Sequence, residues 1–215
     1  NWRSAQNHNS GILMDLNRIR KKFGGDFVAN EHTFILGSDI RFTSHFADRF
    51  ENLNILESCT GAGFTTIQLA KVAKHVISVE IDKTHQKQAT QNIAIAELSD
   101  KVTFIHGSIL DQKLLDGLPL IDAAFLDPDW AVTGPDHKYR FLDSNTQPPA
   151  DVLLDKMFEL TKSVALILPP FVDVKELNNL PNHELERLYI GDSHELFCLY
   201  FGKLKKTIGE TEFHV

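Results

Sequence analysis

The stretch from Asn52 to Asp82 constrains the fold more than any other part of this chain. It predicts a short apolar strand, a turn with glycines at 61 and 63, an amphipathic helix and a second apolar strand. The first strand ends in Glu57 and the second in Glu80. A βαβ unit with glycines in its first turn and an acid at the tip of its second strand suits a nucleoside-bearing cofactor. Such a cofactor lies at the carboxyl ends of a parallel sheet.

The residues around the turn favour one cofactor over another. Gly61 and Gly63 allow a ligand to approach the main chain, and Glu80 is placed to accept hydrogen bonds from both ribose hydroxyls. A dinucleotide turn has a third glycine where this chain has Thr66. Glu57 would repel a pyrophosphate, whereas it suits a positively charged ammonium group. We therefore expect S-adenosyl-L-methionine rather than NAD.

Length and composition predict one soluble domain. The 215 residues are 42% hydrophobic, which is enough for one substantial core. No run of 18 apolar residues occurs, so we expect a cytoplasmic protein without a membrane partner. Cys59 and Cys198 form neither a disulfide framework nor a zinc spacing, and the ten histidines are scattered. We therefore expect no metal.

The charge argues against a dedicated duplex-binding protein, because the formal net charge is −7. Two short segments are nevertheless basic, and their residues are Arg18, Arg20, Lys21 and Lys22 in one and Lys203, Lys205 and Lys206 in the other. Either segment suits contacts with phosphate groups, although solvated helix and strand ends are the simpler interpretation.

Strands and helices are predicted to alternate along the rest of the chain. Further helices are expected at about 11–22, from Thr43 or Ser44 to about 50, from 83 to about 98, and at 152–161. Further strands are expected at 102–105, 121–126, 163–168, 184–190 and 195–202. The last two are predicted to form an antiparallel pair at the edge of the sheet. This pattern is typical of an α/β fold whose sheet is mostly parallel with one reversed strand. We expect a helical extension over residues 1–38 and one domain over residues 39–215.

A second stretch of candidate functional residues follows the strand at 121–126. The strand ends in Asp127, Pro128, Asp129 and Trp130, and a long polar segment rich in turn-forming residues follows. Long loops in compact domains are usually functional. The alternative interpretation is that Asp127 and Pro128 form a strand-end turn and that Trp130 is a core aromatic.

These two stretches together resemble the class I S-adenosylmethionine-dependent methyltransferases. Within that class they most resemble the trimethylguanosine synthase group, the RNA cap guanine-N2 methyltransferases. The resemblance covers about residues 40–202. Its cofactor motif consists here of Glu57, Cys59, Gly61, Gly63 and Glu80. Its serine-proline-proline-tryptophan type of motif corresponds to residues 127–130, with Gly134-Pro135 beyond. Asp127 stands in place of serine and Asp129 in place of the second proline.

The resemblance implies a Rossmann-like sheet of seven strands, one of them antiparallel, with helices on both faces. It implies a set of cofactor-binding residues, namely Thr43, Glu57, Cys59, Gly61, Gly63, Glu80, Ile81, Ser108 and Asp127. Ser108 occupies a position beside the adenine where the family usually has an acid, and Asp111 is the alternative. The implied catalytic residues are Asp127, Pro128 and Trp130, and the implied substrate-binding residues are Asp129 and Trp130.

The function implied is methyl transfer to a guanine N2 amine of RNA, as a step in RNA processing. Hydrogen bonds from the amine to Asp127 and to the Pro128 carbonyl would hold it in line with the methyl group, and Trp130 would stack on the base. The acidic charge and Asp129 favour a small-molecule or protein substrate instead. A non-catalytic binding module and a NAD-linked oxidoreductase remain open as alternatives. Basic residues around the pocket would favour RNA, and an acidic or apolar pocket would favour a small substrate.

Overall fold

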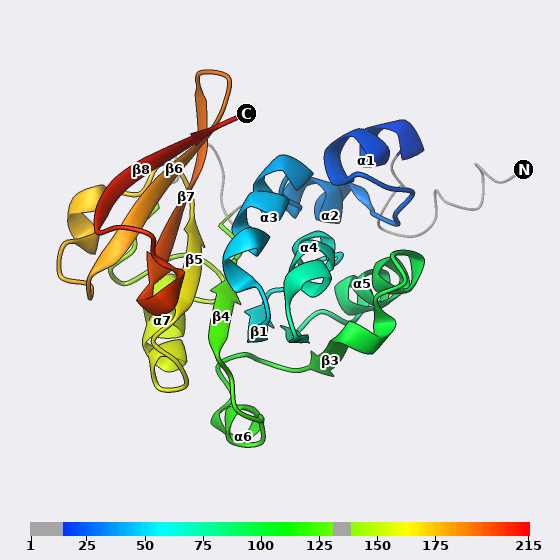
Figure 1. Cartoon of the computed structure of the whole chain (residues 1–215), viewed down its shortest axis with the longest axis horizontal. Coiled ribbons are helices and arrows are strands. Elements are labelled where there is room, and N and C mark those ends of the chain that lie inside the picture. The colour runs from blue at the N-terminus through cyan, green and yellow to red at the C-terminus, as the bar shows by residue number, and fades with distance from the viewer. Residues whose placement is uncertain (1–14, 131–138) are drawn as a thin grey trace, which may run out of the picture. The chain divides into compact units, whose positions relative to one another are not determined.

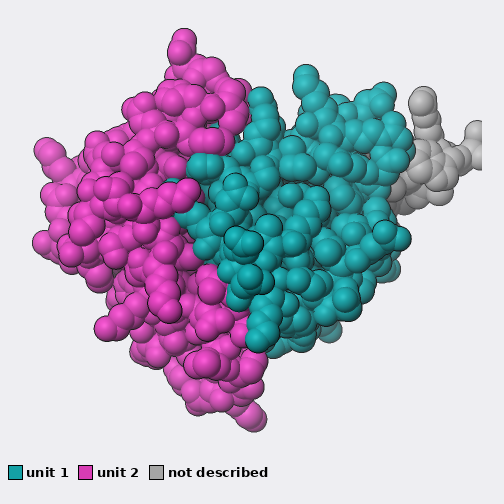
Figure 2. Space-filling model, in the orientation of Figure 1, with its two compact units in different colours: residues 1–52, 60–108 teal, residues 53–59, 109–215 magenta. Residues whose placement is uncertain are grey.

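The computed structural model describes residues 15–130 and 139–215. The start of the helix expected at 11–22, and Gly134-Pro135, lie outside these ranges. The described chain divides into two compact units, coloured separately in Figure 2. The first unit contains residues up to 52 and residues 60–108. The second contains residues 53–59 and 109–215.

The first unit consists of helices around a two-stranded parallel ladder (Figure 1). Its elements are α1 (Leu16–Phe23), α2 (Glu31–Leu36), α3 (Ile40–Ala47), η1 (Asp48–Phe50), α4 (Phe64–Val72), β2 (His75–Glu80), α5 (Lys83–Ile95), η2 (Ser99–Lys101) and β3 (Val102–His106). Strands β2 and β3 run parallel, and Glu80 pairs with His106 at their carboxyl ends. The helix connecting Glu80 to the third strand is therefore α5, as the sequence predicts.

The second unit contains the other six strands. Its elements are β1 (Asn54–Ser58), α6 (Gln112–Asp116), β4 (Ala123–Leu126), α7 (Ala150–Phe158), β5 (Val164–Leu168), η3 (Val174–Leu177), β6 (His183–Ile190), β7 (Ser193–Phe201), η4 (Gly202–Leu204) and β8 (Gly209–His214). Its strands lie in the order β1-β4-β5-β7-β6-β8. β1, β4 and β5 run parallel to one another, and β7 is antiparallel to both of its neighbours.

The expected α/β class and its mostly parallel strands with one reversed strand are confirmed, but the strand count is wrong. The described residues contain eight strands rather than seven. The additional strand is β8, which pairs in parallel with β6 (Figure 1). The predicted antiparallel pair, β6 and β7, is confirmed, yet it does not form the edge because β8 lies outside it.

Local sequence explains where several helices begin. Asn30 and Thr33 form a reciprocal capping box at the start of α2. Asp82 caps α5 by accepting a hydrogen bond from the His85 amide.

The domain boundary proposed at residue 38 stays a prediction. Within the described ranges, every helix is too short or too polar to cross a membrane.

Candidate functional site

In the first unit, Glu80 is held by the backbone on both of its carboxylate oxygens. Its Oε2 accepts a hydrogen bond from the Gly61 amide at 3.0 Å, and its Oε1 accepts one from the Asp82 amide at 3.0 Å. The residue is only 6% exposed. His85 Nδ1 lies 3.9 Å from Oε1. A carboxylate offers about four acceptor positions, so this one is fixed in orientation and still has acceptor capacity for a ligand.

The turn that precedes α4 depends on two glycines with positive φ. Gly61 has a φ of +55° and Gly63 a φ of +86°. A Cβ built on Gly61 meets no described atom within 4 Å, whereas one built on Gly63 lies 3.1 Å from Cα and Cβ of Ala89. Gly61 therefore leaves open space beside the main chain, and Gly63 lets the turn pack closely against α5. The Thr60 hydroxyl, hydrogen-bonded to the Ser78 hydroxyl, ties the turn to β2.

The carboxyl ends of β2 and β3 bring further predicted cofactor residues to Glu80. Ile81 follows Glu80 directly, is 69% exposed, and its carbonyl accepts a hydrogen bond from His106 Nε2 at 3.0 Å. The Gly107 amide donates to the Glu80 carbonyl at 3.1 Å, which places the half-buried Ser108 at the same strand ends. Asp111, the alternative to Ser108, caps α6 through the Lys113 amide and belongs to the second unit.

Thr43 lies inside α3 rather than at its start. The helix is capped by Asp39, whose side chain accepts from the Arg41 amide, so the prediction of a cap at Thr43 or Ser44 is wrong. Thr43 is buried and its hydroxyl donates to the Ile40 carbonyl at 3.4 Å. Helix α3 packs on α4, the helix that follows the glycine turn. A cofactor-binding role for Thr43 stays a prediction.

In the second unit, two acids lie at the carboxyl ends of adjacent parallel strands. Glu57 in β1 pairs with Phe125 in β4, and Ser58 pairs with Leu126. Cys59 and Asp127 each follow directly after these positions, so Asp127 lies beside the end of the strand that carries Glu57. Glu57 is almost completely buried, and Cys59 has a left-handed φ of 58°. The two strand ends therefore bring Glu57, Cys59 and Asp127 to one edge.

The pKa of Asp127 is raised above the ordinary value of an aspartic acid. Burial of the carboxyl and, to a smaller extent, the negative charge of Asp129 raise the pKa of Asp127 to about 7. The main chain of Asp129 is fixed by an antiparallel bridge to Gln147, with N–O distances of 2.8 and 2.7 Å. This bridge sets the path of residues 127–130. Perturbed carboxyls at strand ends are candidates for functional groups.

Three aromatic rings, one of them in this motif and two later in the chain, contact one another in the second unit. Trp130 meets Tyr139 edge to face, with centroids 5.8 Å apart and an interplanar angle of 89°. Tyr139 stacks on Phe171, with centroids 6.0 Å apart and an angle of 16°. Sequence reasoning gave Phe171 no role. The sequence feature that could have indicated a role is its position directly after Pro169-Pro170, which end a buried strand.

The predicted site residues thus form one cluster in each unit. The first unit groups Gly61, Gly63, Glu80, Ile81 and Ser108, and the second groups Glu57, Cys59, Asp127, Pro128, Asp129 and Trp130. The first cluster offers a fixed carboxylate beside open main chain, as a ribose requires. The second offers a carboxyl with a pKa near neutrality and, three residues later in the chain, an indole ring. Their assigned roles stay predictions.

Comparisons with solved structures identify the fold. A "putative methyltransferase" from Porphyromonas gingivalis W83 is 17% identical with a TM-score of 0.72, and the match covers 90% of this chain. It covers 49% of that protein, so this chain spans about half the length of that protein. TrmK from M. capricolum, solved with S-adenosyl-homocysteine, is 14% identical with a TM-score of 0.54, over 80% of this chain and 70% of that one. An rRNA methylase from Streptococcus thermophilus is 12% identical with a TM-score of 0.52, over 77% and 95%.

A family model gives the more specific result. The model described as RNA cap guanine-N2 methyltransferase matches residues 53–193, which include β1, the glycine turn, Glu80 and the Asp127–Trp130 motif. The Rossmann-like methyltransferase fold and the family resemblance expected from the sequence are both confirmed. This chain belongs to the RNA cap guanine-N2 methyltransferase family.

Proposed function

We propose that this chain transfers a methyl group from S-adenosyl-L-methionine to an exocyclic amine, and that the acceptor is N2 of a guanine in RNA. The observation that carries the proposal is Glu80, a nearly buried carboxylate held by the Gly61 and Asp82 amides. Membership in the guanine-N2 methyltransferase family supports the acceptor.

The residues present fit the cofactor. Two acceptor positions of Glu80 are used by backbone amides, and the remaining ones suit the two ribose hydroxyls. Gly61 leaves open space through which a ligand reaches the main chain. Thr66, where a dinucleotide turn would have glycine, is fully buried. Glu57 suits the ammonium end of an amino acid. When bound, S-adenosyl-L-methionine supplies an electrophilic methyl group on its sulfonium.

The second cluster suits an amine acceptor. The lone pair of a guanine N2 amine is conjugated into the ring, so the amine is a weak nucleophile. Its N–H groups would donate to the Asp127 carboxylate and to the Pro128 carbonyl, which would orient it without requiring a strong base. Trp130 would stack on the base. A base within a duplex would first have to leave the stack.

A small molecule or a protein is the second candidate acceptor. Asp129 replaces a proline of the family motif and adds a negative charge beside Asp127, which favours an acceptor that lacks phosphates near the reacting amine.

Calorimetry tests the cofactor assignment. We expect wild-type protein to bind S-adenosyl-L-methionine with micromolar affinity, and Glu80→Gln to bind about 10- to 100-fold more weakly, because charge-assisted hydrogen bonds are lost. The exposed Glu51, in the same unit, provides the matched control Glu51→Gln. Equal affinity in all three proteins would contradict the role of Glu80.

Transfer of labelled methyl groups tests the acceptor. We expect label in RNA, recovered as N2-methylated guanosine after digestion. Cofactor binding without label in any RNA fraction, but with label in small molecules or proteins, would favour the second candidate.

A further inference from the structure

The most exposed aromatic ring beside the second cluster is that of Phe171. Its side chain is 71% exposed, and it follows Pro169-Pro170 at the end of β5. Strand β5 runs parallel to β4, with Leu126 paired to Leu166. The carboxyl end of β5 is therefore at the same edge of the sheet as Asp127, and Phe171 lies on the side where the acceptor is proposed to bind.

Phe171 stacks on a second aromatic ring. Tyr139 stacks on it nearly in parallel, and the same tyrosine meets Trp130 edge to face. Stacked and edge-to-face pairs of this kind stabilise one another and hold ring orientation. One ring, Tyr139, thus links two stacking surfaces, Trp130 at the motif and Phe171 beyond it.

We propose that Phe171, supported by Tyr139, stacks on the base of the nucleotide next to the methylated guanine. The inference rests on the proposed function, since it adds a second base position to the same acceptor site. A planar, exposed and supported ring suits the face of a nucleobase, and such stacking tolerates any base. The acidic Asp127 and Asp129 disfavour phosphate contacts near the motif, so base stacking is the better means of holding a single strand here.

The test compares a mononucleotide with a short oligonucleotide acceptor. The two acceptors are guanosine monophosphate and a capped pentanucleotide RNA with 2-aminopurine as the base next to the cap guanine. For Phe171→Ala we expect KM for the pentanucleotide to rise about 5- to 150-fold, the range of base–aromatic stacking losses. KM for the mononucleotide should stay unchanged. Phe171→Tyr should restore the wild-type value, because it keeps the ring.

Two further readouts separate stacking from a general loss of structure. Quenching of 2-aminopurine fluorescence on binding should be present in wild type and Phe171→Tyr and absent in Phe171→Ala. Leu120, in the same unit and 82% exposed, supplies the control Leu120→Ala, for which we expect wild-type behaviour in every assay.

The outcomes distinguish this inference from the proposed function. If wild type methylates the pentanucleotide and Phe171→Ala does so with the same KM and the same quenching, the stacking inference is wrong while the function stands. Phe171 would then serve a different contact, such as a protein partner. If wild type binds the cofactor but neither binds nor methylates the RNA, both are overturned.

Discussion

Asp127 is the residue whose protonation most directly affects the proposed reaction. Its pKa of about 7 lies well above the ordinary value of an aspartic acid because the half-buried carboxyl loses hydration and Asp129 is negative. Below this pKa the neutral acid loses acceptor capacity for an amine N–H. Above it, the carboxylate can accept that hydrogen bond. The proposed role therefore ties activity to the ionised form.

We expect kcat/KM to rise with pH through about 7 and to level off above it. Asp129→Asn should move the midpoint to lower pH, because it removes a negative charge that disfavours ionisation of Asp127. The measurement is the pH–rate profile of both proteins under the same conditions, with the exposed Asp155→Asn as a control. A midpoint that is the same in wild type and Asp129→Asn would contradict the coupling.

Alanine substitutions of the two turn glycines should affect cofactor affinity and the free energy of unfolding differently. Both have positive φ, so alanine costs about 1 kcal/mol of backbone strain at either site. Gly63→Ala should cost about 2–3 kcal/mol in total, because its Cβ would press on Ala89. Gly61→Ala should cost no more than the strain, yet it should weaken cofactor binding because its Cβ would fill the open space. Chemical denaturation and calorimetry measure the two effects. Equal losses of stability would refute this distinction.

Among the elements, α5 connects the segment between α1 and α2 to the glycine turn through hydrogen bonds of Asn92. This fully buried side chain accepts from the Val28 amide at 2.7 Å and donates to the carbonyls of Val28 and Ala62, both at 2.8 Å. Nearby, Phe64 at the start of α4 stacks on Phe23 of α1, with centroids 3.5 Å apart. Residues that precede the family match therefore support the cofactor turn.

We expect Asn92→Ala to lower the free energy of unfolding by about 2–4 kcal/mol, since it leaves buried backbone groups without partners. It should also weaken cofactor binding, because Ala62 lies between the two turn glycines. The exposed neighbour Gln91 gives the control Gln91→Ala, for which we expect less than about 0.5 kcal/mol. Denaturation and calorimetry again provide both values. Unchanged cofactor affinity in Asn92→Ala would show that the turn holds its shape without this contact.

Features that depend on local sequence were predictable. The turn at Gly61 and Gly63 and the position of Glu80 at the end of β2 agree with the prediction, because a turn with positive φ requires glycine and an acid directly follows the apolar residues of the strand. The start of α3 was placed wrongly because Asp39 competes with Thr43 as a cap and only the structure shows which one is used. The structure brings the pKa of Asp127 near neutrality by burial and by Asp129, which spacing alone could not show.

The missed elements depend on distant partners. Strand β8 has the polar sequence of an edge strand and was not recognised. It is fixed by the buried Glu184, which accepts from the Thr211 hydroxyl at 2.7 Å and from the Lys206 amide at 2.8 Å. The role proposed for Phe171 depends on its stacking on Tyr139, which lies more than thirty positions earlier in the chain. Neither contact can be inferred from local pattern.

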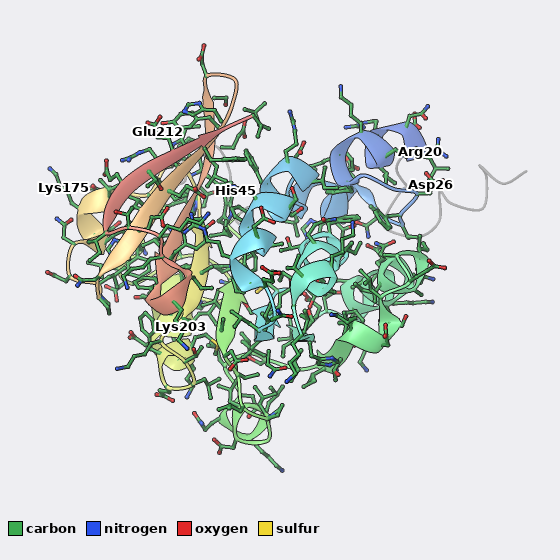
Figure 3. The ribbon with its side chains drawn as sticks, viewed as in Figure 1. Arg20, Asp26, His45, Lys175, Lys203 and Glu212 are labelled. Carbon is green, nitrogen blue, oxygen red and sulfur yellow. The ribbon has the colours of Figure 1, made fainter. Side chains whose placement is uncertain are left out.

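At the scale of the whole molecule, charge limits how the proposed RNA acceptor can be bound. The formal net charge is −7, and three of the four basic residues of α1 make local contacts. Arg20 forms an ion pair with Asp26 (Figure 3), while Arg18 and Lys22 lie over the Phe34 ring at 4.8 and 4.6 Å. These contacts favour the simpler interpretation of that basic segment, a solvated helix face with local partners, over a phosphate-binding patch.

We therefore expect acceptor binding to depend weakly on salt. A protein that engages only two or three phosphates of a single strand should show a slope of log K against log salt no steeper than about −2. The measurement is KM for the capped pentanucleotide between about 50 and about 200 mM salt. Lys21→Glu, on the exposed side of α1, should leave the slope unchanged if this helix contacts no phosphate. A slope steeper than about −3, or one that Lys21→Glu reduces, would show that the backbone of the RNA is the main contact. In that case the aromatic rings of the second unit would contribute less to acceptor binding than we propose.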